Sequence, residues 1–272
     1  MVRLSSLIST AIWIMQWINQ AAAAGVRTVA VGDLHSDLNN TLAVLKLAEL
    51  VDDNTDWIGS DDTLVQLGGL VDKGPDTIAI IELFQKLAIQ AGVTGGAVIN
   101  ILGEHEVYNL AGHYQYVSKE DLDSFKSKRL RVEAWEIRTG WIGRFVYKTF
   151  KAAYVHNKHT FFSNGDVNTF YAKLGAEGIS NHAREALFRN RFTSTLFGKN
   201  GPVASRAYGA GSSTPENICK KVKEVKTILG VKRLVAGHIH QNGQILSLCN
   251  GTYLQIDVGI SSSFVHNLIH SL

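Results

Sequence analysis

Three short clusters of acidic and histidine side chains each follow an apolar segment of this chain and begin with glycine. The clusters are residues 32–35 (Gly-Asp-Leu-His), 103–106 (Gly-Glu-His-Glu) and 237–240 (Gly-His-Ile-His). An α/β protein presents ligands in this way, at the carboxyl edge of its strands. Carboxylate and imidazole groups bind divalent metals, and a glycine-rich turn with two aspartates occupies residues 68–76. The pattern predicts a metal-dependent site for a phosphate group.

The elements that position these clusters follow from hydrophobic periodicity. Three short, apolar, β-branched segments are typical of buried strands. Between them, apolar residues recur at helical spacing after Asp37 and after Asp76, which are both suited to N-capping. Gly92 is expected to end the second helix. The first third of the chain is therefore predicted to be β-α-β-α-β. The three strand segments are residues 26–31, 63–67 and 97–102.

The rest of the chain divides into a helical insertion and a return to sheet. Residues 109–157 are rich in charged and aromatic residues and are predicted to form an inserted helical cap. A helix is expected over residues 183–192 and a loop over residues 198–213. Further strands are predicted at residues 160–163, 233–236, 244–248 and 252–258.

Residues 1–24 have the composition of a secretory signal peptide: Arg3, then an apolar core, then a run of alanines. A retained signal anchor is the alternative. Residues 25–272 are predicted to form one domain, and the protein is expected to be secreted or extracytoplasmic. Cys219 and Cys249 can pair in an oxidising compartment, although two buried thiols would also fit.

The charge of the chain gives no sign of a nucleic-acid partner, because the formal net charge is only +3. Basic residues do cluster at 126–131 and 220–223, where they alternate with apolar residues. Both clusters are predicted to be solvated helix faces. No membrane partner is expected once the signal has been removed.

Five motifs in their order and spacing give the chain a family resemblance. It resembles the calcineurin-like metallophosphoesterases, and more narrowly the Shewanella-like protein phosphatases. The resemblance implies an α/β fold, a four-layer α/β/β/α sandwich of two mixed sheets with an inserted helical cap. The motifs are Gly-Asp-Leu-His-Ser at 32–36, Gly-Gly-Leu-Val-Asp-Lys-Gly at 68–74, Gly-Glu-His-Glu at 103–106, Phe-Phe-Ser-Asn-Gly-Asp at 161–166 and Gly-His-Ile-His at 237–240.

The resemblance implies two metal ions that clamp the phosphate and the attacking water. The first would be held by Asp33, His35 and His240. The carboxylate that bridges both ions in the family is Gly69 here. One ion of Mn, Fe or Zn is therefore expected rather than two, with no metal as the remaining possibility. The second ion's ligand positions are Glu104, Asn164 and His238.

Two of these substitutions leave alternatives open. Glu104 and Glu106 could form ion pairs with Lys or Arg instead of binding metal. At Asn164 the family has a histidine, which His156 or His159 could replace.

The proton-handling and phosphate-binding positions are better preserved. By resemblance His105 would protonate the leaving group, and Asp72 would orient the His105 ring. Arg206 matches a phosphate-binding arginine of the family, whereas a second such arginine is Lys73 here. Lysine keeps the charge but loses the bidentate fork.

Two functions follow from this set. The first is a secreted phosphoesterase of reduced activity, whose substrate is a phosphorylated small molecule or a phosphoprotein. The alternative is a catalytically inactive pseudophosphatase that acts as a binding protein. A phosphodiester or nucleotide substrate is a remoter reading, because a fold does not fix its substrate.

Overall fold

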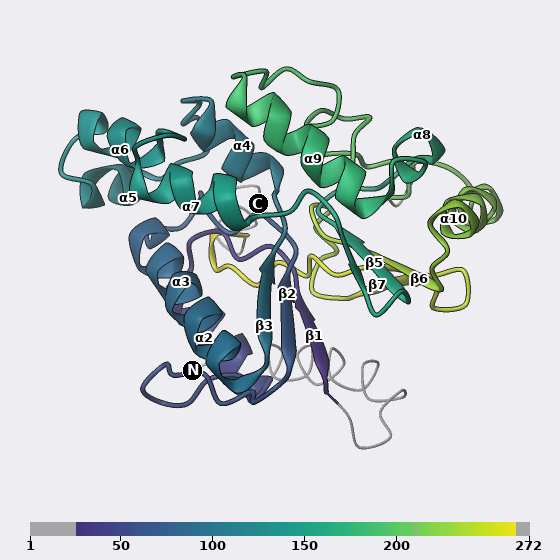
Figure 1. Ribbon diagram of the computed structural model, residues 1–272, viewed down its shortest axis with the longest axis horizontal. Helices are drawn as coiled ribbons and strands as arrows, with labels where there is room; N and C mark the ends of the chain where they lie inside the picture. Colours follow the sequence, from purple (N-terminus) through teal and green to yellow (C-terminus); the bar gives the residue numbers. More distant parts are fainter. Residues whose placement is uncertain (1–25, 210, 265–272) are drawn as a thin grey trace, which may run out of the picture.

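The computed structural model describes residues 26–209 and 211–264, so the predicted signal peptide lies outside the described residues. Two β-sheets form the centre of the molecule (Figure 1). The first holds β1 (Thr28–Val31), β2 (Thr63–Gln66) and β3 (Ala97–Asn100). These strands are parallel, with Thr28 opposite Thr63 and Thr63 opposite Ala97. Parallel pairing follows from the helical crossovers that join them, α2 (Leu38–Leu47) and α3 (Thr77–Thr94).

The second sheet is mixed and has the strand order β4-β5-β6-β8-β7. β5, β6 and β8 are parallel, and the two edge strands pair antiparallel with their neighbours. Its strands are β4 (Tyr154–His156), β5 (Thr160–Ser163), β6 (Arg233–Ala236), β7 (Leu246–Leu248) and β8 (Tyr253–Gln255).

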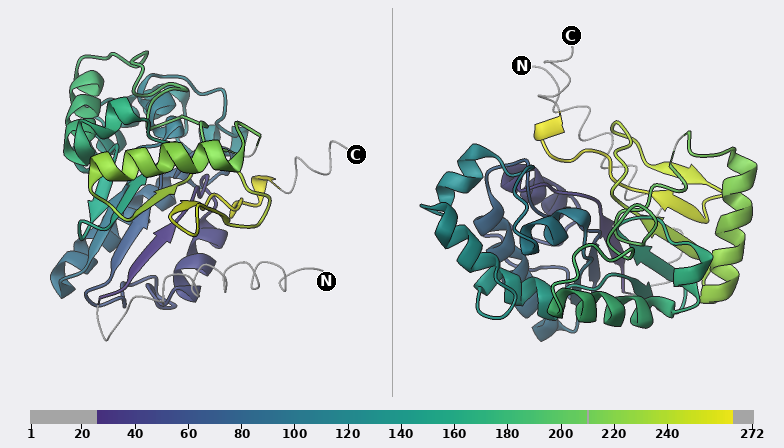
Figure 2. Two further views of the ribbon diagram at one scale, coloured as in Figure 1. Left: turned by 90° about the vertical axis from the view of Figure 1, so that its right-hand side faces the viewer. Right: turned by 90° about the horizontal axis from the view of Figure 1, so that it is seen from above.

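The four layers expected of the fold are present. α2 and α3 cover the outer face of the first sheet (Figure 1), and α10 (Pro215–Leu229) lies on the outer side of the second (Figure 2). A small apolar cluster between the sheets includes Val65 of β2, Phe162 of β5 and Val235 of β6. The core therefore ties both sheets together, and their carboxyl edges meet on one side. Two further helices, α8 (Thr169–Ala172) and α9 (Gly175–Phe188), follow β5.

Residues 109–157, predicted to be a helical cap, contain three complete helices. These are α5 (Lys119–Ser124), α6 (Lys128–Trp135) and α7 (Trp141–Thr149), and α4 (Glu104–Leu110) leads into them. The same range ends with β4, which was not expected from the sequence. In Figure 1 the group lies beyond the carboxyl edge of the first sheet.

α3 is longer than predicted, because it passes through Gly92 and ends at Gly95, whose φ is +87°. A glycine inside a helix costs only about 1 kcal/mol relative to alanine, and the burial of Leu87 and Ala91 outweighs that cost. α3 is also long and apolar enough to cross a membrane. Its buried residues pack in the core, however, as those of a core helix do.

One basic cluster is solvated as predicted and the other is not. Lys220, Lys221 and Lys223 on α10 are exposed, whereas Arg131 on α6 is completely buried. The prediction for residues 126–131 was therefore wrong at Arg131, because this side chain pairs with buried acceptors. The pairing of Cys219 with Cys249 is confirmed: the disulfide joins α10 to the turn between β7 and β8.

Candidate metal and phosphate site

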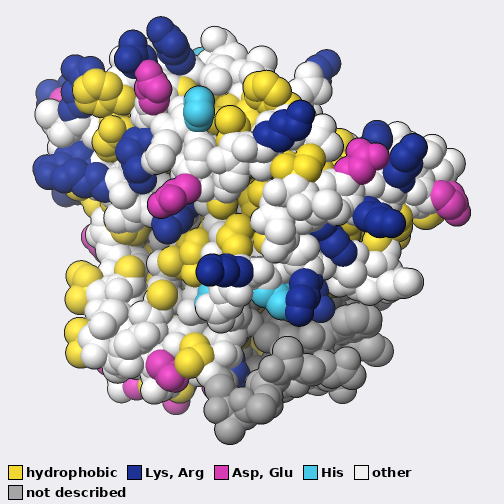
Figure 3. All heavy atoms as spheres, turned by 45° about the vertical axis from the view of Figure 1, so that its right-hand side comes forward, with side chains coloured by type: hydrophobic (Ala, Val, Ile, Leu, Met, Phe, Trp, Pro, Cys, Tyr) yellow, Lys and Arg dark blue, Asp and Glu magenta, His cyan; other side chains and the backbone are white. Residues whose placement is uncertain are grey.

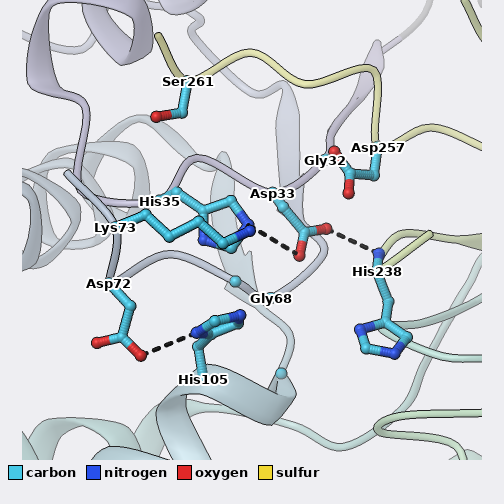
Figure 4. A network of polar contacts seen from close by, with 12 residues as sticks. Gly32, Asp33, His35, Gly68, Asp72, Lys73, His105, His238, Asp257 and Ser261 are labelled. Atoms are coloured by element: carbon cyan, nitrogen blue, oxygen red, sulfur yellow. Dashed lines mark hydrogen bonds and ion pairs between the residues drawn. The ribbon is translucent and has the colours of Figure 1, made fainter. Parts of the chain in front are cut away.

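The carboxyl edges of both sheets bring the predicted site residues together (Figure 4). Asp33 and His35 follow β1, and the turn that carries Asp72 and Lys73 follows β2. The other positions lie after the next strands in the same way: His105 on α4 after β3, Asn164 after β5, and His238 after β6. Asp72, Lys73, His35 and His238 all have positive φ values, between +49° and +72°. Such values in non-glycine residues are typical of functional loops held by their surroundings.

His35 is buried and faces a lysine. Its Nδ1 lies 3.2 Å from the Val71 carbonyl oxygen, and its Nε2 lies 3.0 Å from Lys73 Nζ. Because a carbonyl only accepts, Nδ1 carries the proton and the Nε2 lone pair faces the ammonium. Burial, and then the charge of Lys73, lowers the pKa of His35 well below its usual value. His35 is therefore neutral, and its Nε2 lone pair accepts from the Lys73 ammonium.

Asp33 fills the space next to Gly69. Its Oδ1 accepts the backbone N–H of His238 at 2.8 Å. A Cβ atom built on Gly69 would lie only 2.0 Å from Asp33 Oδ2. The Asp33 carboxylate thus takes the room in which a bridging side chain at position 69 would begin. Burial, and then the nearby Asp257, raises the pKa of Asp33 well above its usual value.

Glu106 organises the loop after β2, and with the residues that the structure describes it forms none of the ion pairs considered for it. Its carboxylate accepts the backbone N–H groups of Gly69 (3.1 Å), Leu70 (2.8 Å), Val71 (3.3 Å) and Gly103 (2.7 Å). Its side chain is completely buried. The acidic residue at the end of this motif therefore holds the backbone that presents Asp72 and Lys73.

The positions expected to bind a second ion are engaged in other contacts. Asn164 Nδ2 donates to the Leu67 carbonyl at 2.6 Å, and its Oδ1 accepts the Glu104 N–H at 3.4 Å. Tyr108 donates its hydroxyl to Glu104 at 2.5 Å. His238 Nε2 accepts from Arg206 Nε at 3.1 Å. Burial, and then the charge of Arg206, lowers the pKa of His238 to about 4.

Three other histidines were considered as metal ligands: His240 for the first ion, and His156 or His159 in place of Asn164. His240 stacks on Phe264, with ring centroids 4.4 Å apart and an interplanar angle of 11°. His156 pairs with Thr160 at the amino end of β5, and His159 directly precedes that residue. Asn164 lies past the other end of β5, so neither histidine reaches its position.

The two residues that were predicted to handle a proton are in contact. His105 Nδ1 lies 2.8 Å from Asp72 Oδ2. Asp72 is fully buried and accepts Asn109 Nδ2 at 2.7 Å through its second oxygen. Arg131 in turn donates to Asn109 Oδ1 at 2.6 Å and to Asp121 Oδ2 at 2.7 Å. The cap therefore fixes the orientation of the pair.

Sequence reasoning missed two residues of this site, Arg131 and Asp257. Asp257 is buried, and its Oδ1 accepts the Gly259 N–H at 3.1 Å. Burial raises the pKa of Asp257, and the charge of Lys73 counteracts this effect. The available signal was an apolar strand segment that ends in Asp257, the same pattern as that of Asp33. Arg131 carried no such signal, because its partners Asp121 and Asn109 lie outside any local helical pattern.

The residues present do not fit a pair of metal ions. The ring nitrogens of His35 and His238 that face Lys73 and Arg206 each contact a protein cation, and position 69 has no carboxylate. Over residues 26–209 and 211–264, no group of three or more His, Cys, Asp or Glu side chains is arranged to hold a metal ion. Unlike His35 and His238, which are buried, Arg206 is exposed. Figure 3 shows lysine and arginine side chains beside histidines on one face of the molecule.

Comparison with known proteins identifies the family. The model of the calcineurin-like phosphoesterases matches residues 26–242, so the chain belongs to that family. Members of this family use divalent metal ions. The chain is 32% identical to an uncharacterised protein of Schizosaccharomyces pombe, over 86% of this chain and 73% of that protein. It is 28% identical to Shewanella-like protein phosphatase 2 of Arabidopsis thaliana, over 89% and 73%.

A solved structure shows the same fold. The cold-active protein-tyrosine phosphatase of a psychrophilic Shewanella species superposes with a TM-score of 0.75 at 20% identity, over 87% of this chain and 72% of that one. The predicted family and fold class are therefore confirmed.

Proposed function

We propose that this chain is a phosphatase-like protein that binds a phosphate monoester without catalysing its metal-dependent hydrolysis. The observation that carries the proposal is the contact between position 69 and Asp33. A bridging carboxylate at position 69 would require Asp33 to move, because a Cβ atom there would lie 2.0 Å from Asp33 Oδ2. Without that bridge, the site lacks the carboxylate that would lie between two close cations and offset their repulsion.

The kinetic consequence is large. The loss of one group that stabilises the transition state typically reduces the rate by roughly 10²–10³-fold. Here the bridge is missing, and the His238 lone pair already accepts from Arg206. Such losses within one catalytic unit do not add, but any one of them places the rate far below that of an intact phosphatase.

A slow hydrolase remains the second candidate, because the hydrogen bond between His105 and Asp72 is intact. A carboxylate–imidazole pair that is held this firmly can still donate a proton to a leaving group. The names of the Shewanella-like phosphatase relatives favour a phosphoprotein ligand in either case.

Hydrolysis of p-nitrophenyl phosphate with Mn²⁺, Fe²⁺ or Zn²⁺ separates the two candidates. We expect the native chain and His105→Ala to be equally inactive. The combined reversion Gly69→Asp, Lys73→Arg, Glu104→Asn and Asn164→His should gain a rate that His105→Ala then abolishes. Native turnover that disappears in His105→Ala would instead support the slow hydrolase.

Phosphate binding needs its own measurement. Calorimetric titration with p-nitrophenyl phosphate should show binding by the native chain and weaker binding by Arg206→Ala, because the exposed guanidinium would contact the phosphate. Equal affinities would contradict the role of Arg206.

We also propose that the protein is exported. The disulfide between Cys219 and Cys249 supports this proposal, because such bonds persist mainly in oxidising compartments. N-terminal sequencing of the mature protein tests it, since cleavage after about residue 24 is expected. A mature chain that keeps its first residues would contradict cleavage.

A further inference from the structure

Lys73 lies among the residues that were predicted to hold the first metal ion. Its Nζ is 3.0 Å from His35 Nε2 and 4.1 Å from the centre of the Phe264 ring. In Figure 4 its side chain runs along His35 toward Asp33. This ring nitrogen of His35 is the one whose lone pair is free, because Nδ1 faces the Val71 carbonyl. The ammonium therefore uses the same lone pair that a metal ion would need.

The carboxylates around Lys73 suit its ammonium to the electrostatic role of a metal cation. Asp33 and Asp257 are both buried. The His35 ring nitrogen that faces Lys73 Nζ also lies 4.0 Å from Asp33 Oδ2. Two buried carboxylates need a cation nearby to remain ionised.

The last described segment of the chain closes this arrangement from the other side. Ser262 donates its backbone N–H (2.8 Å) and its hydroxyl (2.7 Å) to Asp37 Oδ2. Asn40 Nδ2 donates to the Ile260 carbonyl at 2.8 Å. These contacts place the Phe264 ring over the ammonium, an arrangement favourable for a cation, and beside His240.

We infer that the Lys73 ammonium takes the place of the first metal ion in this chain. The inference deepens the proposed function and rests on the family resemblance that assigns Asp33 and His35 to that metal position. An ammonium supplies one positive charge and donates hydrogen bonds, but it has no vacant coordination position for water. The site therefore keeps a cation without the means to activate a nucleophile. Divalent ions and Lys73 should exclude each other.

Calorimetric titration of MnCl₂ into purified protein tests the inference. Lys73→Met should bind Mn²⁺ at least roughly tenfold more tightly than the native chain does. Lys151→Met is the matched control, since Lys151 is also half-buried and its Nζ lies 5.2 Å from the Tyr154 ring. The control should behave like the native chain. The gain in Lys73→Met should disappear when Asp33→Asn is added.

Removal of the ammonium leaves two carboxylates without a counterion, so Lys73→Met could be too unstable to titrate. A measurement on the native chain covers that case: the ¹⁵N chemical shifts of the His35 ring should not move when Zn²⁺ is added. Native Mn²⁺ binding as tight as that of Lys73→Met, no gain in that variant, or a Zn²⁺-dependent shift at His35 would each overturn the inference. None of these readouts depends on hydrolysis, so they are independent of the test of the proposed function.

Discussion

At position 69, two features of the molecule oppose a side chain. The residue has a φ of +58°, and its Cβ would also approach Asp33 Cγ to 2.6 Å. Gly69→Ala should therefore lower the free energy of unfolding by about 1–3 kcal/mol more than Gly112→Ala. Gly112 is the matched control, because its φ is +76° and a Cβ there would meet no atom within 4 Å. Urea unfolding of both variants measures the difference, and equal losses would show that Asp33 moves away freely.

Asp166 should make the stability of the protein depend on pH. Burial raises its pKa to about 6, although Tyr208 N–H and the Tyr253 hydroxyl both donate to it. A carboxyl with a raised pKa binds its proton more tightly when folded, so its contribution to stability falls as the pH rises from about 4 to about 6. A shift of this size corresponds to about 3 kcal/mol.

The matched variant is Asp166→Asn, which keeps the shape but has no proton to lose. From pH 4 to pH 6 it should gain stability relative to the native chain by about this amount. Chemical unfolding at several pH values gives the comparison. Parallel pH profiles for the two proteins would rule out a perturbed Asp166.

Among the elements, α6 of the cap supports the site through one buried side chain. Arg131 NH1 donates to Asp121, and NH2 donates to Asn109, which holds Asp72. Removal of one partner of a buried ion pair leaves the other charge uncompensated, so Arg131→Met should cost about 3–5 kcal/mol. Arg129→Met on the same helix is the control, because its pair with Glu133 is exposed and should contribute at most about 1 kcal/mol. Equal effects in urea unfolding would contradict the proposed support.

The difference between these two arginines also explains how far the sequence alone could predict the structure. The strands and the residues that follow them were predictable, because apolar segments that end in Asp33 or His238 carry a local signal. The burial of Arg131 depends on Asp121 and Asn109, which lie 10 and 22 residues before it, outside any local helical pattern. Side-chain directions are equally non-local: the family motif identifies Lys73 as a phosphate-binding position but not its contact with His35.

Across the whole molecule, the fold does not require the metal chemistry of its family. Glu106 fixes the loop after β2 through four backbone N–H groups, and none of these contacts involves a metal. Asp33 likewise joins β1 to the loop after β6 through the His238 N–H. Asp33 and Glu106, which both lie in the family's motifs, therefore also hold together the loops at the carboxyl edges of the strands.

The disulfide between Cys219 and Cys249 stabilises the molecule as a whole. It joins α10 on the outer face to the turn before β8, across a sequence separation of 30 residues. A covalent loop of this length lowers the entropy of the unfolded chain, and in the chain-entropy model that effect stabilises the fold by about 3–4 kcal/mol. The double variant Cys219→Ala and Cys249→Ala should therefore unfold at a lower urea concentration with its fold intact. Reduced native protein is the control and should show the same loss, because it lacks the same bond. If the midpoint of unfolding were unchanged in both, the packing of α10 on the second sheet would be sufficient without the disulfide.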